Sequence, residues 1–278
     1  MWFIRLARPY NTLLPIVAII VGWLFTHEAL SPELAYLLVA YVFIHSAVTL
    51  RNDVADVSVD VHNLQLGMAR ALQQHRMTVI ISLWALTALS IVCAAFVSPM
   101  AILLVVLMAV VGELYDGTLV KGSHRPVLSI ALLAVGYGLI PVLMGVENYD
   151  ALTVPAVLLA AAWSLQRASL SLLKDFKDIK GDQLVGKRTA LIRYGNRHVV
   201  YASLAFMVIG MVTSIFIVFY VFPRVEFAAI LGAIFAWLVF VRVQLLKVKT
   251  HEESNQIFHT CLHYQLIFDV GMVAWLSI

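Results

Sequence analysis

Long apolar runs, separated by short polar connections, follow one another along the whole chain. Each run is close to the ~20 residues that an α-helix needs to cross a bilayer. The pattern therefore predicts nine membrane-spanning helices. Their expected ranges are Tyr10–Thr26, Leu34–Leu50, Thr78–Val97, Met100–Leu114, Val127–Gly145, Val154–Leu173, Val199–Phe222, Val225–Leu246 and Ile257–Ile278.

Composition agrees with this all-α membrane fold class. Hydrophobic residues make up 62% of the chain and charged residues only 13%, with a mean hydropathy of +0.92. A soluble domain carries about 25% charged residues, so the soluble class is excluded. The net charge of +3 gives no reason to expect a nucleic-acid partner. Cys93 and Cys261 lie singly inside apolar runs, which indicates neither a disulfide framework nor a metal site.

Basic residues show which ends of the helices share a side. Of the 19 Lys and Arg residues, 17 lie on one alternating set of connections; the opposite set holds only Arg224, and Arg167 lies inside a span. The positive-inside rule places the basic set, and the N-terminus with it, in the cytoplasm. No separate soluble segment interrupts the chain, so we expect one domain over residues 1–278, which could be a repeat of four spans.

The pattern D-x-x-D-x-x-x-D occurs twice on this basic side, each time after an apolar run. Its members are Asp53, Asp56 and Asp60, preceded by Asn52, and then Asp175, Asp178 and Asp182. Carboxylates at this spacing fall within about 60° of one another around a helix. Like charges so placed repel each other unless a cation neutralises them. The alternative is a pair of solvated acidic helix ends, but the repetition of one spacing favours two divalent-metal sites.

The metal that best suits these groups is Mg²⁺, which takes oxygen ligands from one or two carboxylates and from substrate phosphates. Two Mg²⁺ ions facing one diphosphate are expected, held first by Asp53, Asp56, Asp175 and Asp178. Asp60 and Asp182 are second choices as ligands. Oxygens of a metal-bound diphosphate that remain free need donors. The candidate diphosphate-binding residues are Asn52, Tyr115, Lys121, Lys187, Arg188 and Arg70, although most basic residues here also satisfy the positive-inside rule.

Polar stripes continue from both acidic segments into the preceding spans. His45 and Thr49 share a helical face with Asn52, and Ser164 and Ser171 share one with Asp175. Such stripes normally face the interior of a bundle, so we expect both to face one cavity. Arg167 is expected to bind phosphate or to pair with Glu113 or Asp269. We expect His45, His259 and His263 to be hydrogen-bonded core residues, and Asp269 and Asn11 to bond between helices.

The segments that contain these residues resemble motifs of the UbiA superfamily of intramembrane prenyltransferases. The matching segments are RNDVADVSVD (Arg51–Asp60), KDFKDIKGDQLVGKRT (Lys174–Thr189), ELYDGTLVKG (Glu113–Gly122) and ARP (Ala7–Pro9). The chain departs from the family pattern where Ala71 follows Arg70, and in the longer spacing from Tyr115 to Lys121. The resemblance implies nine helices around a central cavity capped by cytoplasmic loops.

The resemblance also implies a function. A polyprenyl diphosphate would bind between the acidic segments with its tail among the helices, and Mg²⁺ would assist loss of diphosphate. A small acceptor, commonly aromatic in this family, would attack the resulting allylic cation. One alternative is a UbiA-type terpene cyclase, which needs no acceptor. An alternative of another class is a cation transporter with paired acidic sites, which would distribute acids through the bilayer depth. The sequence carries no signal for prenyl length or oligomeric state.

Overall fold

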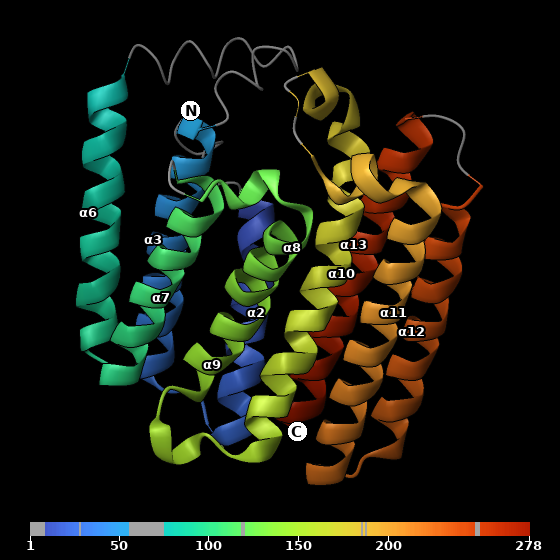
Figure 1. Cartoon of the computed structure of the whole chain (residues 1–278). Helices are drawn as coiled ribbons and strands as arrows, with labels where there is room; N and C mark the ends of the chain where they lie inside the picture. Colours follow the sequence, from blue (N-terminus) through green and yellow to red (C-terminus); the bar gives the residue numbers. More distant parts are fainter. Residues whose placement is uncertain are drawn as a thin grey trace.

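The protein is an all-helical bundle in which the long helices run alternately up and down (Figure 1). The computed structural model describes residues 9–27, 29–55, 75–117, 120–184, 186, 188–247 and 251–278, and no strand occurs within them. The helices are α2 (Pro9–Thr26), α3 (Pro32–Ala55), α6 (Arg76–Ala95), α7 (Pro99–Asp116), α8 (Pro126–Ala134), α9 (Ile140–Val146), α10 (Val154–Leu184), α11 (Ala190–Val221), α12 (Val225–Gln244) and α13 (His251–Ser277).

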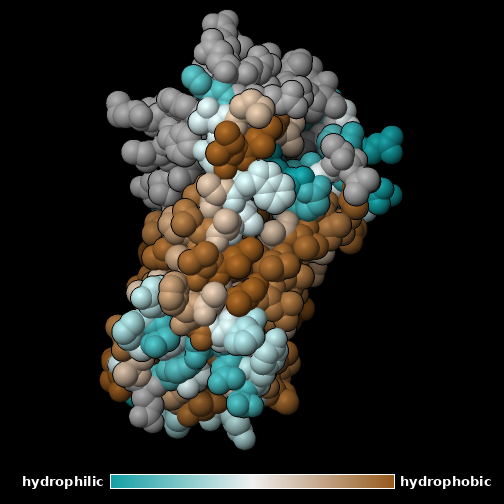
Figure 2. Space-filling view, turned by 90° about the vertical axis from the view of Figure 1, so that its left-hand side faces the viewer, coloured by the Kyte–Doolittle hydropathy of each residue, from teal (hydrophilic) through white to brown (hydrophobic). Residues whose placement is uncertain are grey.

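Each predicted apolar run is helical in the structure. Seven spans in the described part of the chain are long and apolar enough to cross a membrane, with α8 and α9 joined in one of them. The apolar part of α2, Thr12–Thr26, is shorter, and α13 is not among the seven, so the expected number of nine spans is not confirmed. The surface supports a membrane location, because a broad apolar band lies between two more polar ends (Figure 2).

Proline and serine positions explain several helix boundaries. Pro99 stands in the first turn of α7, after Ser98, whose Oγ accepts a hydrogen bond from the backbone N–H of Ala101 at 3.1 Å. Between α8 and α9, a π-helix at Val135–Leu139 precedes Pro141. Because proline has no N–H and its ring crowds the carbonyl four residues earlier, the helix widens there instead of continuing as a regular α-helix.

Close helix approach at glycines holds the bundle together. A Cβ atom on Gly22 of α2 would lie 2.1 Å from the carbonyl oxygen of Val142, and one on Gly145 of α9 would lie 2.1 Å from that of Ile19. No side chain fits at either point. The two backbones therefore pack directly against each other, as small residues allow between membrane helices.

A buried polar network links α10, α11 and α13. Arg167 Nη2 donates to Asp269 Oδ2 at 2.5 Å, and both side chains are almost completely buried. Gln265 donates to Asp269 Oδ1 at 3.0 Å and to Gln166 Oε1 at 2.7 Å. Gln166 in turn donates to Ser214 Oγ of α11 at 2.9 Å. The expected pairing of Arg167 with Asp269 is confirmed, whereas the side chain of Asn11 lies outside the described residues.

Three sequence-based interpretations need correction. The sequence pattern places Arg242 in a connection, whereas in the structure it lies inside α12 and is fully buried. Its Nη1 donates to Ser169 Oγ at 2.6 Å. It shares an inward face with Leu231 and Leu238, which are equally buried. His259 and His263 are exposed rather than core residues. Both lie on the outer side of α13, opposite the face that carries Asp269 and Gln265.

Candidate active site

The first acidic segment begins inside α3. This helix runs on to Ala55, beyond the expected limit at Leu50, because Asn52 and Asp53 continue its helical phase. Asp53 is fully buried and Asn52 is partly buried. Arg51 pairs with Glu113 of α7. Asp56, Asp60 and Arg70 lie outside the described residues, so their expected roles stay predictions.

The second acidic segment is one continuous part of α10. The helix runs through Asp175, Asp178 and Asp182 to Leu184, so the three positions have the helical spacing that the sequence predicts. Asp175 is partly buried and Asp182 is 4% exposed. The side chain of Asp178 lies outside the described part of the structure. The order along the helix places these acids at its end on the side of the basic connections.

A lysine of the second segment reaches α7. Lys174 Nζ donates to Tyr115 Oη at 2.8 Å and lies 5.3 Å from the centre of the tyrosine ring. A tyrosine hydroxyl that accepts this bond can still donate its own proton to another group. Lys174 also interacts electrostatically with the adjacent Asp175. The sequence gives Lys174 no signal beyond that of the other basic residues, because its partner lies 59 positions away.

Helix α7 connects the two acidic segments. Glu113 holds Arg51 of α3, and Tyr115, two residues further along α7, holds Lys174 of α10. The ends of α3, α7 and α10 that carry these residues lie at the same end of the bundle (Figure 1). Arg51 and Lys174, which directly precede Asn52 and Asp175 in the chain, thus flank one turn of α7.

The connection after α7 adds a strained lysine to this end. Lys121 has a left-handed backbone, with φ 49° and ψ 54°, and its side chain is exposed. Such a conformation costs a non-glycine residue about 1–2 kcal/mol. Arg188, before α11, is also exposed. Lys187 lies outside the described residues. Both described cations are therefore accessible to an anion on this side of the bundle.

The candidate metal ligands have the chemistry that Mg²⁺ requires. All the candidate ligands are carboxylate oxygens, the hard ligands that Mg²⁺ prefers beside phosphate oxygens. In the parts of the chain that the structure covers, no three His, Cys, Asp or Glu side chains come close enough to hold a metal by themselves. A site completed by substrate oxygens is consistent with this, since Mg²⁺ commonly takes only one or two protein carboxylates.

Nearer the middle of the bundle, polar side chains of three helical elements meet at His45. Its Nδ1 lies 3.1 Å from Thr12 Oγ1 of α2, and its Nε2 lies 3.1 Å from Tyr137 Oη in the π-helix. His45 is fully buried, which confirms the expectation of a hydrogen-bonded core histidine. Tyr41, one turn earlier on α3, donates to the carbonyl of Gly136 at 3.2 Å. These bonds fix α3 against the π-helix below Asp53.

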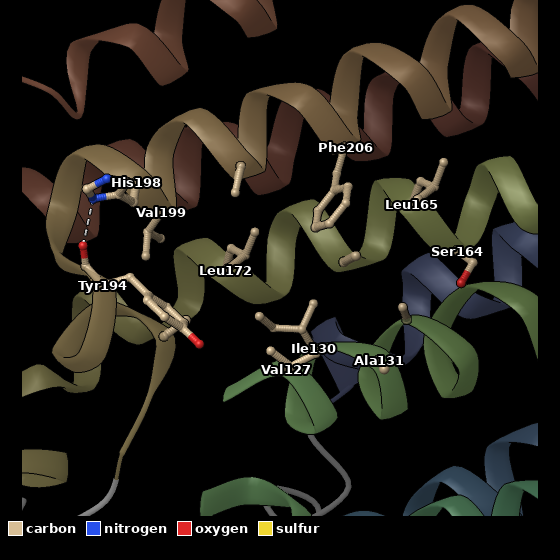
Figure 3. A pocket seen from close by; sticks show the side chains of 14 residues that line it. Val127, Ile130, Ala131, Ser164, Leu165, Leu172, Tyr194, His198, Val199 and Phe206 are labelled. Atoms are coloured by element: carbon tan, nitrogen blue, oxygen red, sulfur yellow. Dashed lines mark hydrogen bonds between the residues drawn. The ribbon is translucent and has the colours of Figure 1, made fainter. Parts of the chain in front are cut away.

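A separate groove of about 440 Å³ opens between α8, α10 and α11 (Figure 3). Ser164 lies in its wall. The expectation that Ser164 faces a cavity shared with the first acidic segment is therefore wrong. The reason is that α8 and α11 flank this face of α10 and leave it open between them, below Asp175.

Comparisons with known proteins were made by sequence and by structure. The family model described as the UbiA prenyltransferase family matches residues 13–267. A structure of a digeranylgeranylglyceryl phosphate synthase is similar at 18% identity, with a TM-score of 0.73, covering 99% of this chain and 98% of that one. A UbiA homolog from Archaeoglobus fulgidus, bound to GPP and Mg²⁺, is similar at 16% identity and a TM-score of 0.73, covering 100% of both chains.

An apo UbiA homolog from Aeropyrum pernix K1 is similar at 20% identity and a TM-score of 0.72, covering 95% of this chain and 97% of that one. A search of curated proteins found no match. At these identities the solved structures show a shared fold.

Proposed function

The chain belongs to the UbiA prenyltransferase family, and from this premise we propose that it transfers the prenyl group of a polyprenyl diphosphate to a small aromatic acceptor. The observation that carries the proposal is the turn of α7 that binds both acidic segments, through Arg51–Glu113 and Lys174–Tyr115. The similar Archaeoglobus fulgidus homolog was solved with GPP and Mg²⁺, which agrees with a diphosphate between these segments.

The residues proposed to hold two Mg²⁺ ions are Asp53, Asp56, Asp175 and Asp178, with Asp60 and Asp182 as second choices. When bound, Mg²⁺ acts as a Lewis acid that stabilises charge on the departing diphosphate. The complete burial of Asp53 supports this role, because a buried carboxylate gains most from a neighbouring cation.

The chain's own donors complete the proposed diphosphate site. Lys174 fixes the hydroxyl of Tyr115, which is left able to donate its proton to a diphosphate oxygen. Lys121 and Arg188 are exposed at the same end and provide charged hydrogen bonds. Asn52, Arg70 and Lys187 are further candidates for the same group.

The prenyl tail is proposed to lie among the apolar helices below the acids. Loss of diphosphate leaves an allylic cation, which bonds to a ring carbon of the acceptor before water reaches it, and that ring carbon then releases its proton. The apolar body of the bundle supports this order of events, because it excludes water from the reacting carbon.

The decisive experiment is a product assay of purified protein. Prenyl diphosphates of graded chain length are crossed with a panel of aromatic acceptors, and products are identified by mass spectrometry. We expect Mg²⁺-dependent prenylation that EDTA removes reversibly. D53A and D175A should each lose at least about a thousandfold in turnover, because loss of metal-bound charge stabilisation amounts to several kcal/mol.

A matched control is D150A, since Asp150 is an exposed aspartate at the opposite end of the bundle. It should keep wild-type turnover. Full activity of D53A or D175A in the presence of chelator contradicts the metal assignment. Release of a cyclic hydrocarbon without acceptor consumption would identify the chain as a terpene cyclase of this fold instead.

The proposed site faces the cytoplasm, as does the N-terminus. Support comes from the asymmetry between the two sets of connections: 16 basic residues remain on one side once the buried Arg242 is set apart, against Arg224 alone on the other. Single cysteines near Gly67 and Gly186 should be labelled only from the cytoplasm, and one near Asn148 only from outside. Outside labelling at Gly186 would place the second acidic segment on the wrong side.

A further inference from the structure

The groove between α8, α10 and α11 is almost wholly apolar and lies outside the set of residues proposed for catalysis. Its walls include Ile130 and Ala131 of α8, Ala168 and Leu172 of α10, and Ala202 and Phe206 of α11. Figure 3 shows these side chains around an open channel, with Tyr194 and His198 at one end and Phe206 further along. Alanines on all three helices leave the space that larger side chains would fill.

The groove has about the depth of one membrane leaflet. His198 and Phe206 are eight residues apart on the continuous part of α11, which corresponds to roughly 12 Å at ~1.5 Å per residue, and Tyr194 lies beyond the break at the mouth. Half of a bilayer's apolar core is about 15 Å thick. The groove therefore matches the length of one hydrocarbon chain that enters from the side of the basic connections.

A break in α11 forms the mouth of the groove. Gly195 has φ 78° and ψ 166°, a backbone that favours glycine, and it separates Tyr194 from the continuous helix beyond. His198 Nδ1 donates to the carbonyl of Tyr194 at 2.9 Å, which leaves its Nε2 for another partner. The break turns the Tyr194 ring towards the α8 side of the groove (Figure 3).

The mouth is basic. Residues 190–198 hold Arg193 and Arg197, both exposed, and no Asp or Glu. Arg193 lies 5.4 Å from the centre of the Tyr194 ring and is exposed. Tyr194 lines the same end of the groove and carries a hydroxyl. An apolar channel about one leaflet deep thus ends at cations and a hydroxyl donor, which is complementary to a lipid with a phosphate head group.

We propose that the groove is a binding site for an anionic phospholipid. One acyl chain lies between α8, α10 and α11, and the phosphate contacts Arg193 and His198 at the mouth. The site is distinct from the donor site, and the proposal holds whether or not the chain transfers prenyl groups.

The test is lipid retention by the purified full-length protein, measured by native mass spectrometry after incubation with phosphatidylglycerol or phosphatidylcholine of equal chain length. The wild type should retain one phosphatidylglycerol and prefer it to phosphatidylcholine. R193Q/H198Q should reduce that preference about fivefold or more, since one interfacial charge contributes about a fivefold change in affinity. K247Q, which removes an exposed charge at the end of α12, is the matched control and should not change it.

The second part of the test fills the groove with a larger side chain. A131F places a ring in the channel and should remove the bound lipid, whereas A229F adds the same ring on the exposed surface of α12 and should not. If A131F does not fold, the exposed charge variants still decide the question. Equal retention of both lipids, or wild-type retention by A131F, overturns the proposal. Displacement of the lipid by a prenyl diphosphate also overturns it, because the groove would then hold the donor's tail.

Discussion

The two ends of the bundle use polar side chains differently. At the end opposite the acidic segments, most of these side chains bond to backbone carbonyls: Trp23 donates to Ala29 at 2.8 Å, Ser98 to Glu147 at 2.5 Å, and Trp275 to Phe222 at 2.9 Å, while His27 and Glu147 form a side-chain pair at 3.6 Å. At the end that carries the acids, side chains pair with side chains of other helices, as in Arg51–Glu113 and Lys174–Tyr115. The first arrangement satisfies the ends of helices, whereas the second positions charged groups.

Backbone strain does not distinguish the two ends. Lys121 at the acidic end and Glu147 at the opposite end both have left-handed backbones, with φ 49° and φ 56°. Glu147 is held from both sides, since its N–H donates to Leu143 and its carbonyl accepts from Ser98. The backbone of Lys121 is held in the same way, since its N–H donates to the carbonyl of Gly117 and its own carbonyl accepts from His124, but its side chain is exposed. We therefore infer that the functional end is identified by charged side chains that are not engaged in capping a helix.

The comparison is tested most strongly by removing cations at the acidic end. K121A, K187A and R188A should each lower kcat/KM for the prenyl diphosphate about ten- to a hundredfold, because one charged hydrogen bond contributes roughly 1.5–3 kcal/mol. The KM for the acceptor should change much less. The measurement is steady-state kinetics with donor and acceptor varied separately, and R224A, at the opposite end, is the control.

Two outcomes count against this assignment. Wild-type donor kinetics in all three variants would reduce these residues to determinants of topology. A defect confined to the acceptor would move them to the acceptor pocket. Either result would leave the carboxylates as the only functional feature of the acidic end.

At the opposite end, the expected effect is on stability alone. Ser98 both accepts from Ala101 N–H and donates to the carbonyl of Glu147. S98A should therefore destabilise the protein by about 1 kcal/mol, the usual effect of losing an N-cap, with unchanged kcat/KM. Thermal unfolding in detergent measures this. S277A is the control, because the Ser277 hydroxyl bonds only within its own helix. A loss of activity in S98A without a loss of stability would contradict the comparison.

The sequence predicted the helices well because apolar length and charge placement are local signals. The starts of the spans agree closely in most cases, and the clear disagreements have physical causes. Helix α3 extends to Ala55 and α10 to Leu184, beyond the apolar runs, because the acidic segments keep the helical phase after apolarity ends. Helix α11 begins at Ala190 instead of the expected Val199, because it includes a short helical part that precedes the break at Gly195 and is less apolar than the rest.

Apart from the pairing of Arg167 with Asp269, the contacts between distant helices were beyond the reach of the sequence. The pattern singled out Asp53 and Asp175 but gave no reason to connect Glu113 with Arg51 or Tyr115 with Lys174, which depend on how α7 packs. Arg242 could have been noticed, because apolar residues surround it in a helical run. Ser164 was misplaced because helical phase defines a face of α10 but not which helix lies against it.

The smallest expected effect is a pH dependence of stability at the end opposite the acidic segments. Burial raises the pKa of the Glu147 carboxyl above its ordinary value, against the opposing influence of His27, whose Nε2 lies 3.6 Å from Glu147 Oε1. Glu33 nearby raises it further. A raised carboxyl pKa means that the folded state binds the proton more tightly than the unfolded state. Stability should therefore fall as pH rises from about 4.3, the ordinary Glu value, through the raised pKa of Glu147, and stay level above it.

The measurement is the difference in melting temperature between the wild type and E147Q, followed from about pH 4 to pH 8 so that it spans the ordinary and raised values. Titrating groups that do not interact with Glu147 contribute equally to both proteins and cancel. The wild type should lose stability relative to E147Q as pH rises, and H27Q should enlarge that loss, because it removes the cation that favours the ionised carboxylate. A difference that grows in the opposite direction would mean that the His27 pair outweighs burial. The opposite end would then be held by charge pairing, like the acidic end, and the contrast between the two would disappear.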